Sequence, residues 1–96
     1  MKPPIASVFP PGAFLREELE ARGWTQAELA EILGRPIQTI NQIVNGKKEI
    51  TPATAIELSA ALGTSPEFWL NLEVAYQLAK AAPADPAIAQ RAKRRA

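Results

Sequence analysis

Apolar residues along the chain recur three and four positions apart, the spacing that places side chains on one face of an α-helix. Five segments show it, and residues that start or stop helices bound them. They begin near residues 13, 25, 36, 51 and 65, and they end at Gly23, Gly34, Gly46, Gly63 and before Pro83. No segment alternates like a β-strand. The pattern predicts an all-α protein with five helices.

Proline and the apolar period divide the chain into three parts. Residues 1–10 are rich in proline and predict an irregular N-terminal arm. Residues 11–82 hold the five helices and predict a single domain whose last helix serves dimerisation. Residues 83–96 are basic and rich in alanine and proline, without a clear helical apolar period, so we expect a mobile tail.

The second and third predicted helices form a recognisable pair joined by a tight turn. The pair combines a capping box, a small residue at the helix crossing, a turn glycine that tolerates left-handed backbone, and apolar contacts from the third helix. These positions are Thr25 with Glu28, Ala30, Gly34, Ile40 and Ile43. Apolar spacing alone would fit any helical bundle, but the joint pattern favours a helix-turn-helix.

The outer face of the third helix carries Ile37, Gln38, Asn41 and Gln42. Glutamine and asparagine amides can offer a paired donor and acceptor to adenine in the major groove, and an aliphatic side chain can contact a thymine methyl. We therefore expect these residues to read bases, with a solvated surface as the alternative. Asn45 is more typical of a helix cap beside Gly46.

Groups suited to phosphate flank this face. Thr25 and Gln26 begin the second helix, where free backbone N–H groups favour an anion. Arg35 lies in the turn, and Lys47 and Lys48 follow the third helix. We expect these five residues to contact the DNA backbone, which positions the protein without reading sequence.

The formal net charge of +1 gives no basic excess of the kind usual in nucleic-acid binders. The charges are nevertheless segregated along the chain. Residues 35–48 carry three basic residues and no acid, whereas residues 16–34 carry five glutamates against two arginines. The near-zero total therefore averages a basic segment around the third helix and an acidic segment before it.

The chain contains no cysteine and no histidine. These absences exclude zinc sites of the Cys/His type, disulfides, and catalysis by Ser-His-Asp or Cys-His groups. The acids lie mostly at exposed helical spacings, and no apolar run approaches the length of a membrane span. We expect no enzymatic activity, no metal, no cofactor, no membrane partner and a cytoplasmic location.

The fifth predicted helix carries Trp69, Leu72 and Tyr76. Aromatic residues seven positions apart on an amphipathic helix are more often core or dimer seam than the lining of a ligand pocket.

Several of these motifs together resemble a known family. The segments Thr25-Gln26-Ala27-Glu28-Leu29-Ala30, Gln38-Thr39-Ile40 and Asn45-Gly46-Lys47, with Gly34 between them, resemble the Xre family of lambdoid-repressor-type DNA-binding domains. The run Gly63-Thr64-Ser65-Pro66-Glu67-Phe68-Trp69-Leu70-Asn71-Leu72 is more specific and resembles the HigA (VapI-like) antitoxins. This resemblance covers about residues 8 to 80.

The resemblance implies a five-helix lambda-repressor-like domain that forms a homodimer through its C-terminal helices. Such a dimer binds a palindromic operator in double-stranded DNA, represses its own operon, and neutralises a RelE-like toxin that cleaves mRNA. Matching positions make Ile37, Gln38, Asn41 and Gln42 base readers and place Gln26 and Lys47 on phosphates. The C-terminal dimer helices correspond here to the segment of Trp69, Leu72 and Tyr76.

Two positions depart from the family pattern, since relatives tend to have histidine where Pro10 stands and a polar or basic residue where Ile37 stands. The tail supports a second hypothesis, because residues 85–94 resemble the linker in longer regulators that join this domain to an ImmA/IrrE-type metallopeptidase. A protein-binding module with a degenerate helix-turn-helix is a third hypothesis.

Overall fold

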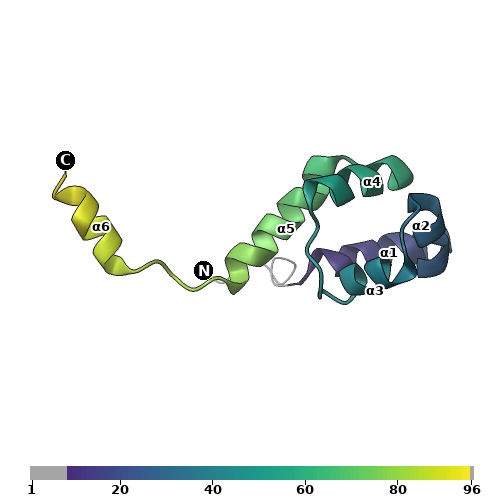
Figure 1. The fold of residues 1–96 in the computed structure, drawn as a ribbon, viewed down its shortest axis with the longest axis horizontal. Helices are drawn as coiled ribbons and strands as arrows, with labels where there is room; N and C mark the ends of the chain where they lie inside the picture. The colour runs from purple at the N-terminus through teal and green to yellow at the C-terminus, as the bar shows by residue number, and fades with distance from the viewer. Residues whose placement is uncertain (1–8, 96) are drawn as a thin grey trace.

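The structure, a computed structural model, describes residues 9–95, so all but the last two residues of the predicted arm lie outside the described residues. Within this range the chain forms six α-helices and no strand (Figure 1). The helices are α1 (Pro11–Arg22), α2 (Gln26–Leu33), α3 (Ile37–Val44), α4 (Pro52–Leu62), α5 (Pro66–Lys80) and α6 (Pro86–Lys93). The all-α prediction is confirmed, and α1 to α5 match the five predicted helices.

The starts of α2, α4 and α5 follow from side-chain capping. The predicted capping box of α2 is present, because the Thr25 hydroxyl accepts the Glu28 N–H at 3.0 Å and the Glu28 carboxylate accepts the Thr25 N–H at 3.1 Å. At α4 and α5 only the N-cap hydroxyl takes part: Thr51 accepts the Thr54 N–H and Ser65 accepts the Phe68 N–H. Each cap satisfies a backbone donor that the first helical turn leaves free.

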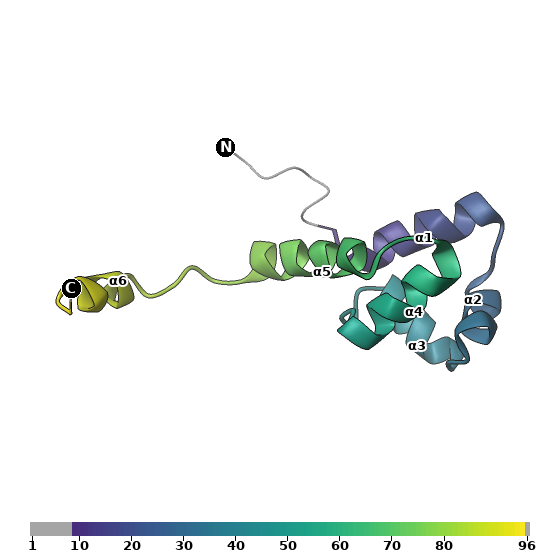
Figure 2. The same ribbon diagram turned by 90° about the horizontal axis from the view of Figure 1, so that it is seen from above.

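Helices α1 to α5 enclose one hydrophobic core. Its fully buried large side chains come from all five helices: Leu15, Leu29, Ile40, Ile43, Leu58 and Trp69. Figures 1 and 2 show α5 leaving this body along the long axis of the molecule, with α2 and α3 at the other end. None of the described helices is long and apolar enough to cross a membrane.

The beginning of α1 packs directly on the end of α3. A Cβ atom built on Gly12 would lie 2.0 Å from the carbonyl oxygen of Ile43 and 2.6 Å from that of Val44. Only glycine permits this approach, because the neighbouring atoms are backbone and cannot rotate away. Gly12 therefore fixes how closely α3 sits against α1.

A buried carboxylate joins the connection between α3 and α4 to the middle of α5. Glu73 accepts the Ile50 N–H at 2.8 Å and the side-chain amide of Gln77 at 2.7 Å. Both its oxygens are thus hydrogen-bonded although the side chain lies inside the fold.

Helix α6 corrects the prediction of five helices. The missed signal was local: Asp85 caps the helix by accepting the Ala87 N–H at 3.0 Å, and Pro86 occupies the first helical position. No residue of α6 is buried, and both views show the helix apart from the body (Figures 1 and 2). The apolar period was absent from the sequence because this helix has no core to face.

Candidate nucleic-acid interface

Helices α2 and α3 are joined by a tight turn at Gly34. This glycine has φ 68° and ψ 34°, in the left-handed region that disfavours other residues. The Arg35 N–H then donates to the Ala30 carbonyl at 2.9 Å and closes the end of α2. Ala30 itself is buried where the helices meet, so the turn and the crossing form as the sequence predicts.

Helix α3 has one buried and one exposed face. Ile40, Ile43 and Val44 enter the core, whereas the four predicted base readers, Ile37, Gln38, Asn41 and Gln42, are all exposed. Ile37 is 40% exposed, so part of this aliphatic side chain is open to a partner. Within the described part of the chain, none of the three side-chain amides takes part in a hydrogen bond. Their donors and acceptors are therefore free to meet an external partner.

The start of α2 lies beside a cation, Arg16, that was not among the predicted phosphate contacts. A shallow hollow is lined by Arg16, Thr25 and Gln26, together with Leu19, Glu20 and Trp24. The guanidinium of Arg16 also donates to the Asn45 side chain at 3.4 Å, which brings it to the end of α3. Arg16 was not predictable because 29 residues separate it from Asn45.

Arg35 is paired with an acid. Its guanidinium donates two hydrogen bonds to Glu57 on α4, at 2.9 and 2.6 Å. Hydrogen bonding to Arg35 lowers the pKa of Glu57, and the same bond raises the pKa of Arg35. The predicted phosphate contact therefore carries a charge that Glu57 already compensates.

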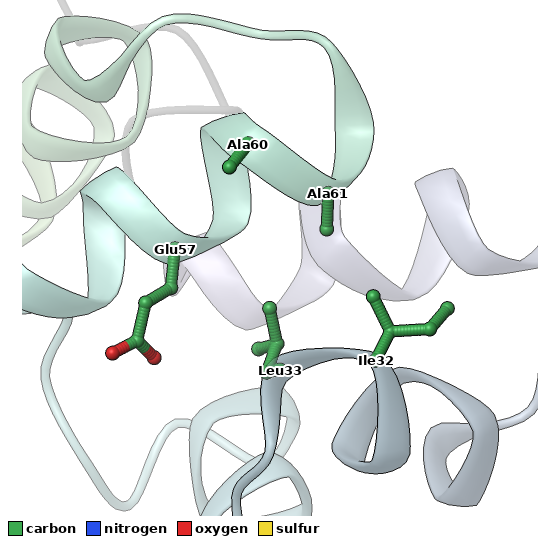
Figure 3. Close-up of a pocket in the computed structure, with 5 residues that line it drawn as sticks. All are labelled: Ile32, Leu33, Glu57, Ala60 and Ala61. Carbon is green, nitrogen blue, oxygen red and sulfur yellow. The ribbon is translucent and has the colours of Figure 1, made fainter.

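Glu57 also borders a shallow apolar hollow where α4 passes over the end of α2. Figure 3 shows Leu33 of α2 next to Glu57 and Ile32 at the other end of the hollow, opposite Ala61, with Ala60 of α4 completing the lining. The Arg35–Glu57 pair therefore ties the turn of the helix pair to α4 at the edge of this hollow.

Lys47 and Lys48 follow α3 and are exposed. Their backbone N–H groups both donate to the Gln42 carbonyl, at 2.8 and 3.2 Å, so this segment folds back on the end of α3. In the range 9–95, neither lysine forms an ion pair. They are thus uncompensated cations next to the exposed face of α3.

The structure places the three predicted dimer residues of α5 differently from one another. Trp69 is fully buried, and its indole N–H donates to the Thr64 hydroxyl at 2.7 Å. It is a core residue of the single chain, so its side chain offers no surface to a partner. Leu72 and Tyr76 are half-buried.

The most exposed apolar side chains of α5 are instead Val74 and Leu78, at 55% and 71% exposure. With the half-buried Leu70 they form a strip at four-residue spacing, which lines a groove beside the connection between α3 and α4. That spacing was present in the sequence, but periodicity alone did not tell which side of α5 faces the core.

The helix-turn-helix family model HTH_3 matches residues 15–69, from the middle of α1 to the start of α5. This chain belongs to that helix-turn-helix family. The match contains the whole α2–α3 pair and all of α4.

Named relatives are similar over most of the chain. The antitoxin HigA-1 of Vibrio cholerae is 44% identical over 68 residues, which cover 70% of this chain and 64% of that protein. An uncharacterised HTH-type transcriptional regulator of Escherichia coli (strain K12), YddM, is 37% identical over 71 residues, which cover 74% of this chain and 76% of the regulator. The sequence resemblance to HigA antitoxins is thereby confirmed.

A solved structure extends the similarity to almost the full chain. PA4674 of Pseudomonas aeruginosa, in complex with its 18-base-pair operator DNA, superposes with a TM-score of 0.76 at 34% identity. The alignment covers 95% of this chain and 94% of that protein.

Proposed function

We propose that this helix-turn-helix protein is a sequence-specific DNA-binding repressor and the antitoxin of a toxin–antitoxin pair. The observation that carries the proposal is the exposed face of α3, where three amides that bond to no group among residues 9–95 lie opposite a face that is buried in the core. The relatives support the same function, since one is named an antitoxin and another is held on its operator.

In the proposed complex α3 lies in the major groove, as the second helix of such a pair does. Gln38, Asn41 and Gln42 hydrogen-bond base edges, and Ile37 contacts a thymine methyl. Because α3 is anchored by buried aliphatic side chains and by the close contact at Gly12, its outer face is presented in a fixed orientation.

Phosphate contacts on both sides of α3 hold it in register. On one side are the free backbone N–H groups at the start of α2, with Gln26 and the neighbouring Arg16. On the other side are Lys47 and Lys48. Thr25 contributes by capping α2, since its hydroxyl already accepts the Glu28 N–H. Arg35 can bind a phosphate only when that phosphate displaces the carboxylate of Glu57.

Two copies bind together in this proposal. Helix-turn-helix dimers read two half-sites about 34 Å apart on one side of the duplex. Because the two domains are joined, the second binding event is intramolecular, and the dimer binds much more tightly than one domain alone. The exposed strip of Val74 and Leu78 on α5, with Leu70, is the dimer surface that the exposures favour. Leu72 and Tyr76 remain at its margin, and Trp69 supports α5 from inside the core.

The toxin partner follows from the antitoxin relatives and belongs to the same proposal: a RelE-like, mRNA-cleaving protein encoded beside this one. The relatives favour this hypothesis over the peptidase-linked regulator. Coexpression with the neighbouring gene tests it directly. A stoichiometric complex that restores growth is the expected result, and a neighbour that is neither toxic nor bound by the chain would contradict it.

The DNA-binding proposal is tested with Gln38→Ala and with Asn71→Ala as a matched control, since Asn71 is an exposed amide on α5. The probes are a duplex from upstream of the protein's own reading frame and a scrambled duplex of equal length. Gln38→Ala should weaken binding to the upstream duplex by about 1–3 kcal/mol and spare the scrambled one. Equal losses on both probes would show that Gln38 reads no base.

A further inference from the structure

Helix α6 and the two residues after it form an exposed basic segment, residues 86–95. It contains four cations within five positions: Arg91, Lys93, Arg94 and Arg95. All four are exposed, and across residues 9–95 their side chains make no hydrogen bond or ion pair. The nearest acid in the sequence, Asp85, is the N-cap at the opposite end of α6.

Folding accounts for only two of these four charges. Cations in the last turn of a helix are favoured by its dipole, which explains Arg91 and Lys93. Arg94 and Arg95 lie beyond the last helical residue. Since no residue of α6 is buried, none of the four serves the packing of the body.

The rest of the described chain has the opposite charge. Residues 9–80 carry six lysines and arginines against nine glutamates, a net charge of −3, whereas residues 81–95 carry four basic residues against Asp85, a net charge of +3. Three of the six cations in the body are already engaged by side chains of Glu18, Asn45 and Glu57. A body of this charge is repelled at long range by a duplex, so it benefits from an attached cation cluster.

We infer that residues 86–95 are a second DNA-contacting element, which binds backbone phosphates and reads no bases. The inference rests on the proposed function, since it needs the α3 face to bring the chain to DNA. Residues 81–85 are not helical and can span up to about 17 Å, and α6 is about 12 Å long. Because α6 packs on nothing, it can lie along a nearby backbone without disturbing the core.

The test compares two full-length variants with the wild type. In the neutral variant Arg91, Lys93, Arg94 and Arg95 are all replaced by glutamine, and in the charge-preserving variant the three arginines are replaced by lysine. Affinity is measured by fluorescence anisotropy against salt concentration, on the upstream duplex and on the scrambled duplex. Unchanged melting curves are expected for both variants, because α6 buries nothing.

If the four cations meet two to four phosphates, the neutral variant should lower the slope of log affinity against log salt by about 2–4 per bound protomer. It should weaken both duplexes by the same factor, and the charge-preserving variant should behave as the wild type. An unchanged slope, or a loss confined to the upstream duplex, would overturn the inference.

The same titrations separate this inference from the proposed function. Gln38→Ala should change the ratio of the two affinities and leave the slope unchanged. If the wild type prefers the upstream duplex and the neutral variant keeps the wild-type slope, only the α6 inference fails. If the wild type shows no preference for any duplex but the neutral variant loses slope, the phosphate contact stands and sequence-specific repression fails.

Discussion

Replacing Gly12 by alanine is expected to destabilise this protein, although alanine is ordinarily the better helix residue. Within a helix the exchange favours folding by up to about 1 kcal/mol, because glycine loses more backbone freedom. Here the new methyl group would meet the carbonyl oxygens of Ile43 and Val44 at 2.0 and 2.6 Å. An ordinary contact needs about 3.4 Å, so α1 and α3 would have to part by about 1 Å or more.

The cost follows from which atoms are in contact. A flexible side chain could rotate away, but the atoms facing Gly12 belong to the backbone of Ile43 and Val44, whose own side chains are buried in the core. Overpacking of this kind typically costs 1–3 kcal/mol, and here it falls at the upper end because nothing can yield locally. Net of the helix preference, we expect a loss of about 2 kcal/mol, equivalent to about 8–16 °C in Tm.

The assay is thermal and urea unfolding followed by circular dichroism, with Gly23→Ala as the control. Gly23 has φ 69° and no atom near its would-be Cβ, so its substitution tests left-handed strain alone, at about 1 kcal/mol. Gly12→Ala should be the more damaging change and should also weaken DNA binding, because α3 is displaced. A Gly12→Ala protein as stable as the wild type would refute the close contact between α1 and α3.

Three further changes test other parts of the site. Replacing Lys47 and Lys48 together by alanine should lower the salt slope of DNA binding by about 1–2, and an unchanged slope would remove both from the phosphate contacts. Glu57→Gln should tighten binding to any duplex by freeing Arg35; equal affinities would mean that Arg35 does not reach DNA. The pKa of Glu57 is lowered in the fold, so the stability it contributes is present at neutral pH and is lost as pH falls through the folded pKa. The stability of Glu57→Gln should therefore vary less with pH in the acid range than that of the wild type. Identical acid-unfolding profiles of the two proteins would contradict the Arg35–Glu57 pairing. Leu78→Glu should shift sedimentation towards monomer while Tm of the protomer is kept, since Leu78 is 71% exposed; a retained dimer would place the interface elsewhere.

The helix ends and the exposed face of α3 could be predicted because their causes are local. Thr25 needs only a glutamate three positions later to form its cap, and Gly34 needs only its own backbone freedom. The amides of α3 were identified because Ile40 and Ile43 lie three positions apart on one face and leave the amides on the opposite face. These features are therefore carried by neighbouring residues and need no knowledge of the packed structure.

The missed features depend on residues far apart in the chain. Periodicity showed that Trp69 is on an apolar face, but only packing shows that this face turns inward while Leu78 turns outward. The partner of Arg35 lies 22 residues away, on α4. The need for glycine at position 12 likewise cannot be predicted from the sequence, because the backbone that Gly12 contacts belongs to α3.

The hydrogen bond from Ile50 to Glu73 has a consequence for the operator itself. It ties the connection between α3 and α4 to the middle of α5, and so links the helix proposed to read bases with the helix proposed to carry the dimer surface. In a dimer built on α5, the separation and tilt of the two α3 helices are then set inside each protomer. The protomer structure would then set the number of base pairs between the two operator half-sites. A Glu73→Ala variant, which lacks this hydrogen bond, should bind operators whose half-site spacing the wild type does not accept.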